Sequence, residues 1–109
     1  MLVVTTETVA GQQITESLGL VRGNTIRARH VGKDIMAGLR TLVGGEIHEF
    51  TKLVAESREQ ALDRMIDEAK SLGADAVVGT RFTTSVIMGG AAELLAVGTA
   101  VKLAPNESP

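Results

Sequence analysis

Apolar residues alternate with polar or small ones near both ends of the chain, and they recur every three to four positions in the middle. Leu2–Val4 is a short, β-branched strand candidate, and a period of two begins at Ile14. Two glycines within this second strand, Gly19 and Gly23, predict a bulge or a close approach of another backbone. The alternation predicts one strand face made of Ile14, Glu16, Leu18 and Leu20.

Helical spacing takes over after residue 32. A short amphipathic helix is predicted to end at Gly44-Gly45, with the stripe Ile35, Met36, Leu39, Leu42 and Val43. A longer stripe runs from Glu46 to Leu72, but Ser57 begins a capping-box pattern, so the span is one helix or two. A single helix would measure ~40 Å, against about 34 Å for a compact domain. It must therefore bend near Ser57 or project against a neighbouring subunit.

Two more alternating segments close the chain. Ala76–Ile87 and Leu94–Leu103 predict strands joined by a hairpin turn at Met88–Ala92. In the first, one predicted face carries Val78, Thr80, Phe82, Thr84 and Val86. A second face is made of small apolar residues, namely Val77, Gly79, Ala96, Gly98 and Ala100. Small residues admit another backbone, so we expect a partner chain to cover this face, or else the N-terminal strands.

The predicted order of elements is β-β-α-α-β-β. This order favours an α+β fold in which a small antiparallel or mixed sheet packs on a long helix. The length of 109 residues suits one domain, expected over residues 1–103, and leaves a polar tail over residues 104–109.

Composition removes several classes of function. The chain has no cysteine, which excludes disulfides, thiolate metal sites and cysteine nucleophiles. A net charge of −2 argues against nucleic-acid binding, and the only aromatic residues are Phe50 and Phe82. No apolar run reaches the ~20 residues that a membrane span needs, and the N-terminus does not resemble a signal peptide. We therefore expect a cytoplasmic protein that binds neither nucleic acid nor membrane.

Charge is distributed unevenly along the chain. The span Ser17–Lys33 has no acid but several bases, namely Arg22, Arg27, Arg29, His30 and Lys33. The span Glu46–Glu68 is rich in acids, namely Glu46, Glu49, Glu56, Glu59, Asp63, Asp67 and Glu68. We expect the two spans to face each other, within one chain or between chains. The alternative is an anion-binding patch on the basic span.

Long stretches of the sequence resemble the YbjQ-like family. The resemblance is carried by Val43–Ile47, Ser57–Phe82 and Ile87–Leu103, and Leu2–Thr6 and Gly19–Gly23 are similar too. It implies a small bacterial or archaeal cytoplasmic protein with a dodecin-like subunit. It also implies a ring-shaped homopentamer in which extra strands join neighbours. The family is often labelled as heavy-metal-binding, but its activity is not established, so no catalytic residues carry over.

The sequence offers few side chains that could bind a heavy metal, as the family label would require. Soft metals favour thiolates, which are absent, and Met36 and Met65 lie on apolar helical stripes typical of core residues. The remaining candidates for a divalent metal are His30, His48 and Glu49. His48 lies in one helical turn with two carboxylates, but the three do not share one face. We therefore expect His48 to be an exposed helix residue, with metal binding as the alternative.

Signatures of enzymes are absent, so we expect no catalysis. If the last two strands pair around the glycine turn, Arg81 and Glu93 lie on the same face of the sheet. They form either a structural ion pair or, with Glu46, a charged site for a small anionic ligand at a subunit junction. The predicted function is a non-enzymatic homo-oligomeric module that is structural or binds such a ligand. The alternative is a metal-binding protein.

Overall fold

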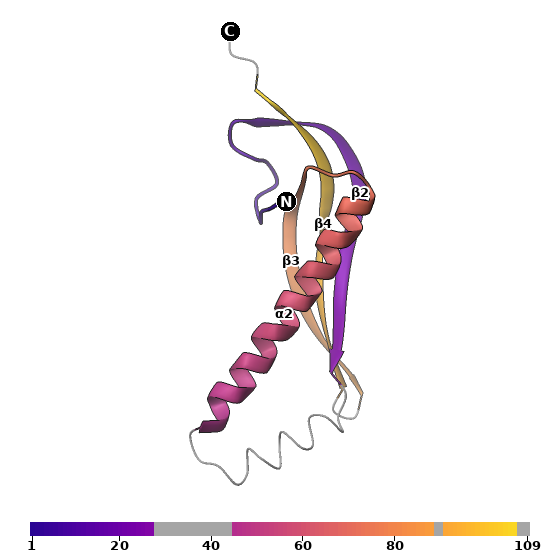
Figure 1. The fold of residues 1–109 in the computed structure, drawn as a ribbon. Helices are drawn as coiled ribbons and strands as arrows, with labels where there is room; N and C mark the ends of the chain where they lie inside the picture. Colours follow the sequence, from indigo (N-terminus) through magenta and orange to yellow (C-terminus); the bar gives the residue numbers. More distant parts are fainter. Residues whose placement is uncertain (28–44, 89–90, 107–109) are drawn as a thin grey trace.

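The computed structural model describes residues 1–27, 45–88 and 91–106, without the side chains of residues 27, 45–53, 86–88 and 91 (Figure 1). It contains four strands, β1 (Leu2–Val3), β2 (Gln12–Arg27), β3 (Ala76–Met88) and β4 (Ala91–Pro105), and the helix α2 (Gly45–Ser71). The short helix expected at residues 35–43 lies outside the described residues.

The strands form one mixed sheet in the order β1-β3-β4-β2. β1 pairs with β3 in parallel, whereas β3–β4 and β4–β2 are antiparallel. This confirms the predicted α+β class with a mixed sheet and one long helix. Met88 pairs with Ala91, as the expected hairpin requires, although its turn at residues 89–90 is not described. β4 extends to Pro105, two residues into the segment expected to be a tail.

The helix α2 is continuous across Ser57 and spans 27 residues, so the capping-box pattern does not begin a second helix. Its second half lies diagonally over β2 and β4, while its first half runs past the sheet (Figure 1). The radius of gyration is 17.9 Å. A compact chain of this length would have about 13 Å. The helix therefore projects instead of bending, which was one of the two predicted outcomes.

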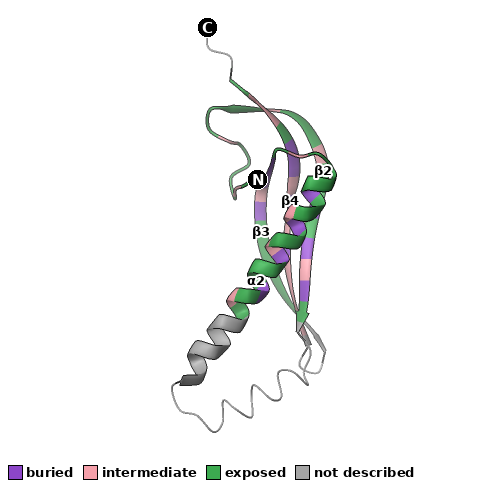
Figure 2. Cartoon of the chain, viewed as in Figure 1, coloured by how far each residue is buried: buried purple, intermediate pink, exposed green. Residues whose placement is uncertain are grey.

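A buried stripe at intervals of four residues attaches α2 to the sheet, namely Ser57, Ala61, Met65 and Ala69 (Figure 2). Ala61, Met65 and Ala69 form one core cluster with Val21 of β2, Val77 of β3, and Ala96 and Ala100 of β4, all fully buried. The small-residue face is therefore covered by the helix of the same chain, and the expected cover by a partner was wrong. Alanine and glycine are needed there because the helix backbone itself lies against the strands.

The opposite face of the sheet, called here the far face, has its own small core. Ala76, Val78 and Val101 are buried there under Val4 and Val9 of the N-terminal segment. This cover reaches only one end of the face. Farther along β2, Leu20 and Ile26 are 64% and 55% exposed. The far face is thus half core and half open apolar surface.

Bulges break the simple alternation that the sequence predicted. In β3, Val78 pairs with Thr99 and Arg81 with Val97, so one extra residue lies between them, next to Gly79 at a φ of 63°. Phe82 therefore shares the helix side with Val77, and the predicted grouping of Phe82 with Val78 was wrong.

β2 has two similar register shifts, between Ile14 and Glu16 and between Ser17 and Gly19. These shifts place Leu18 against the helix-side core and Ile14 against the far-face core. The predicted common face of Ile14 and Leu18 was therefore wrong. The bulge expected at Gly19 is confirmed by its φ of 114°.

Candidate functional site

Three strands place two of the charged candidates, Arg81 and Glu93, on the far face. Val97 of β4 pairs with Arg22 of β2 on one side and with Arg81 of β3 on the other. Four positions earlier in β4, Glu93 pairs with Ile26 and Ser85. Since directly paired residues and residues two apart share a face, all these side chains belong to the far face. Arg81 and Glu93 thus lie on one face, as expected.

Arg81 and Glu93 do not meet, however. Four residues along a strand separate them by roughly 13 Å. Arg81 uses its Nη1 to donate to the backbone oxygens of Thr5, at 2.7 Å, and Thr80, at 2.8 Å. The guanidinium therefore ties the N-terminal segment to β3. The ion pair considered from the sequence is not formed, and Arg81 has a structural role.

Glu93 belongs to a polar cluster at the end of β2 that the sequence did not reveal. Its Oε2 accepts a hydrogen bond from Nδ2 of Asn24 at 2.9 Å. The backbone oxygen of Asn24 accepts from Nη1 of Arg64 on α2. Next to it, Thr25 donates from Oγ1 to the backbone oxygen of Ser57 at 3.3 Å. The cluster joins β4, β2 and α2 where the helix leaves the sheet. An asparagine in a strand, where it is disfavoured, was the available signal.

One buried hydroxyl in the described part of the chain has no hydrogen-bond partner. Thr80 is 3% exposed, and its Oγ1 is unpartnered among the described residues. The hydroxyl lies near Gly98, since a Cβ built on that glycine would be 3.3 Å from it. An apolar side chain of the same shape would fit this position without leaving a polar atom unpaired.

The residues considered for metal binding are only partly placed. His48, Glu49 and Glu46 lie in the first turns of α2, their side chains are not described, and His30 lies outside the described residues. Among the residues whose side chains are described, 1–26, 54–85 and 92–106, no three histidine, aspartate or glutamate residues gather as a metal site. Met65 is fully buried in the core. With no cysteine in the sequence, the donors do not fit a soft heavy metal.

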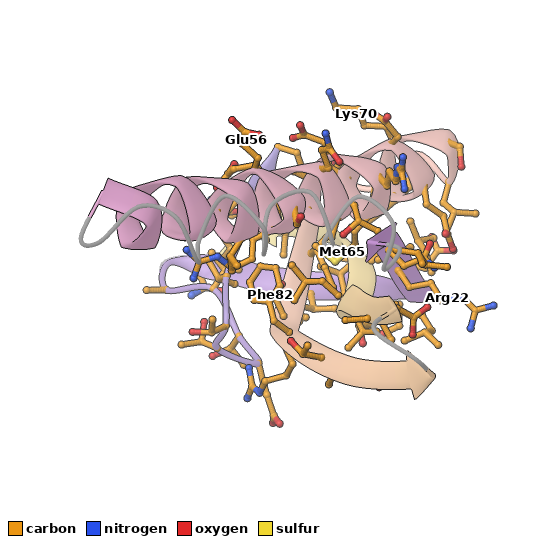
Figure 3. All side chains as sticks on the ribbon, turned by 90° about the horizontal axis from the view of Figure 1, so that it is seen from below. Arg22, Glu56, Met65, Lys70 and Phe82 are labelled. Atoms are coloured by element: carbon orange, nitrogen blue, oxygen red, sulfur yellow. The ribbon has the colours of Figure 1, made fainter. Side chains whose placement is uncertain are left out.

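Arg22 and the acids of α2 lie on opposite sides of the described chain. The outer side of α2 carries exposed acids, namely Glu56, Glu59, Asp63, Asp67 and Glu68. Arg22 lies on the far face of the sheet and, among the described residues, forms no ion pair. Figure 3 shows Glu56 on the outer side of the helix and Arg22 well away from it. Arg22 and the acidic helix side therefore do not face each other within one chain; the other bases of the basic span lack described side chains.

No helix in the described ranges is long and apolar enough to cross a membrane.

Comparison with known proteins identifies the family. The YbjQ-like family model, described as "Putative heavy-metal-binding", matches residues 1–104. A UPF0145 protein of Archaeoglobus fulgidus is 62% identical over 94% of this chain and 95% of its own length. A UPF0145 protein of Methanosarcina acetivorans is 57% identical over 94% of this chain and 97% of its own length.

The fold is also found in a solved structure. The crystal structure of a protein with unknown function of the DUF74 family, from Pediococcus pentosaceus, superposes with a TM-score of 0.63. It covers 95% of this chain and 98% of that one at 16% identity, so the likeness concerns the fold alone. The family model matches nearly the full length of the chain, and the two relatives are 57% and 62% identical to it. The chain belongs to the YbjQ-like (UPF0145) family.

Proposed function

We propose that this protein is a non-enzymatic homo-oligomeric module, built from copies that cover one another's open sheet surface. The observation that carries the proposal is the far face of the sheet. Leu20 and Ile26 are 64% and 55% exposed there, beside half-buried Leu95 and Val97. Monomeric proteins rarely leave large apolar side chains grouped on one open surface. A neighbouring copy of the same chain can cover this surface without any other protein.

The size of the assembly and its ligand follow from the resemblance and from the charges. The family resemblance implies a ring of five copies. A neighbour on the far face would lie next to Arg22, Arg81 and Glu93, which belong to that face. Such a junction would hold a small anionic ligand through Arg22, since Arg81 and Glu93 already have partners within the chain. Without a ligand the role is structural.

Native mass spectrometry with light scattering tests the assembly. We expect a single species of five copies at micromolar concentration, and a clean monomer would contradict the proposal. Leu20→Asp is expected to dissociate the assembly, because it places a charge in the apolar contact. The matched control is Leu72→Asp, at a 44% exposed leucine just after the end of α2, which is expected to leave the mass unchanged. Mass spectrometry of small molecules released from the native oligomer then identifies any ligand.

Metal binding through His48, Glu49 and His30 is the second candidate, and it is favoured by the description of the family as heavy-metal-binding. Imidazole and carboxylate suit zinc, copper or nickel better than soft heavy metals. A stoichiometric metal in purified protein, lost in His48→Ala, is the result that this candidate requires. Metal-free protein that binds no added zinc, copper or nickel would exclude it.

A further inference from the structure

Two arginines lie on either side of one valine on the far face. Val97 of β4 pairs with Arg22 of β2 and with Arg81 of β3, so the three residues form one row across three strands. We call these three residues the arginine row. Neighbouring strands lie about 4.8 Å apart, so roughly 10 Å separates the backbones of the two arginines. Two long side chains on the same face can reach one small molecule that lies over the valine between them.

Neither arginine is neutralised by an acid among the described residues. Arg22 is exposed and forms no described ion pair or hydrogen bond (Figure 3). The described partners of Arg81 are backbone oxygens, which carry no net charge. On the same face of β4, the acid Glu93 lies four residues from Val97, and its carboxylate accepts a hydrogen bond from Asn24. Two uncompensated positive charges in one row create a local potential that attracts an anion.

The hydrogen bonds of Arg81 leave part of its guanidinium available. Both described bonds, to the backbone oxygens of Thr5 and Thr80, start from Nη1. An arginine has five N–H donors, so those of Nε and Nη2 have no partner among the described residues. The bonds at Nη1 also hold the side chain in place, so less conformational entropy is lost when a ligand binds. Arg81 can therefore keep its structural role and donate to a ligand as well.

We propose that the arginine row binds the phosphate group of a small phosphomonoester whose organic part is apolar. A carboxylate has two oxygens, which one arginine satisfies in a bidentate pair. The three terminal oxygens of a phosphate can accept from two arginines, and planar guanidinium groups fit them well. A phosphomonoester also carries nearly two negative charges at neutral pH, which match the charges of Arg22 and Arg81.

The side chains around the arginine row favour an apolar organic part. Half-buried Val97 lies between the arginines, and half-buried Leu95 lies two residues before it on the same face of β4. On β2, Leu20 lies two residues before Arg22 and is 64% exposed. An apolar group attached to the phosphate would remove part of this surface from water, which strengthens binding. The inference names the class of the anionic ligand in the proposed function, so it rests on that ligand and not on the assembly.

Titration of the unmodified protein in a phosphate-free buffer at about pH 8 tests the ligand class, because a phosphomonoester is a dianion there. Phenyl phosphate is the probe, and we expect it to shift the NMR amide signals of Arg22, Arg81 and Val97. Phenyl sulfate has a similar shape but one charge less, and inorganic phosphate lacks the ring. Each is expected to bind about tenfold more weakly than phenyl phosphate. Equal binding of phenyl sulfate would overturn the match of two charges, and equal binding of inorganic phosphate would overturn the apolar organic part.

Variants locate the site. Arg22→Gln and Arg81→Gln are each expected to weaken the binding of phenyl phosphate about tenfold, because each removes charged donors. The matched control is Arg58→Gln, which removes an exposed arginine of α2 on the other side of the sheet and should leave the affinity unchanged. Arg22 has no described partner, so Arg22→Gln tests the site even if Arg81→Gln loosens the N-terminal segment. Equal affinities of Arg22→Gln and Arg58→Gln would show that the arginine row is not the site.

The outcomes separate this inference from the proposed assembly. If native mass spectrometry shows an oligomer but phenyl phosphate does not bind, the inference is wrong, although the homo-oligomeric module stands. If the protein is monomeric and binds phenyl phosphate in a way that needs Arg22, the assembly is wrong and the phosphate site stands.

Discussion

Two threonines of the sheet are buried to the same extent but differ in their hydrogen bonding. Thr25 and Thr80 are both 3% exposed. Thr25 donates to the backbone oxygen of Ser57, where α2 meets β2. The hydroxyl of Thr80 finds no partner among the described residues. Burying a hydroxyl is unfavourable unless a hydrogen bond compensates the loss of water, so the same side chain stabilises one site and weakens the other.

Replacing each threonine by valine should therefore shift stability in opposite directions. Thr80→Val is expected to raise the free energy of unfolding by about 1 kcal/mol, because it removes an unpaired buried hydroxyl. Thr25→Val is expected to lower it by about 1 kcal/mol, because the hydrogen bond from the Thr25 hydroxyl to the backbone oxygen of Ser57 is lost. Urea denaturation of the two variants in parallel measures both values. Equal and unfavourable shifts would mean that the Thr80 hydroxyl has a favourable partner in solution.

Between elements, the helix backbone lies directly against the sheet at Gly23. A Cβ built on this glycine would collide with the backbone of Ala61 and Met65 and would come within 2.7 Å of the Cβ of Arg64. Backbone atoms cannot move aside as the end of a flexible side chain can. The sequence had predicted at Gly23 either a bulge or a close backbone, and the structure confirms the close backbone.

Gly23→Ala is expected to lower the free energy of unfolding by about 1–3 kcal/mol, since an added methyl overpacks the contact between helix and sheet. The change should also speed amide exchange in α2 around Ala61 and Met65. Gly19→Ala is the control on the same strand. Nothing lies near its Cβ, and its cost comes from a φ of 114°. It should therefore leave exchange in α2 unchanged. If both variants loosen α2 equally, the contact at Gly23 is not the cause.

The N-terminal segment is attached to β3 by few interactions. Apart from the pairing of β1 with β3, backbone bonds join Val4 to Val77 and Thr80, and Thr6 to Gly79. The two hydrogen bonds of Arg81 add a side-chain tie at Thr5 and Thr80. This segment also covers the far-face core, so its attachment controls how much of that core meets solvent.

Arg81→Ala is expected to raise amide exchange at Val4, Gly79 and Thr80 about tenfold, because the segment loses a charged donor that bridges it to β3. Hydrogen–deuterium exchange followed by NMR or mass spectrometry measures the change. The control is Arg22→Ala, because Arg22 lies on the same face and has no partner among the described residues. Amide exchange at Val4, Gly79 and Thr80 in this variant should match that of the unmodified protein. Unchanged exchange in Arg81→Ala would show that the backbone bonds alone hold the segment.

At the scale of the whole molecule, periodicity predicted the elements well and their faces poorly. The change from a period of two to helical spacing located β2, α2, β3 and β4, and the glycine signals at Gly19 and Gly23 marked a bulge and a close backbone. The faces were misplaced because a bulge inserts one residue and reverses every later position in the strand. No residue type around Ile14 marks the first extra residue of β2, whereas Gly79 does mark the bulge in β3 and was read only as a small residue of the strand face.

The candidate site was predictable only as far as a shared face. Pairing around the hairpin placed Arg81 and Glu93 together on the far face. Their true partners, Thr5 and Asn24, come from segments distant in sequence, and no local pattern connects them. Likewise, the small residues of β4 predicted that another backbone packs closely on them, but they did not indicate which segment or chain supplies it. A helix of the same chain and a neighbouring copy leave the same signature in the sequence.

The bulge at Gly79 has a consequence for how β3 tolerates changes of length. Val78 before the extra residue and Arg81 after it pair with Thr99 and Val97, which lie on the same face of β4. Loss of the codon for the one extra residue would therefore remove the bulge and leave every later pair and its facing unchanged. Loss of a codon in the regular part of the strand would instead shift the register and turn the residues beyond it to the other side of the sheet. Selection should therefore tolerate a deletion at the bulge more readily than a deletion elsewhere in β3.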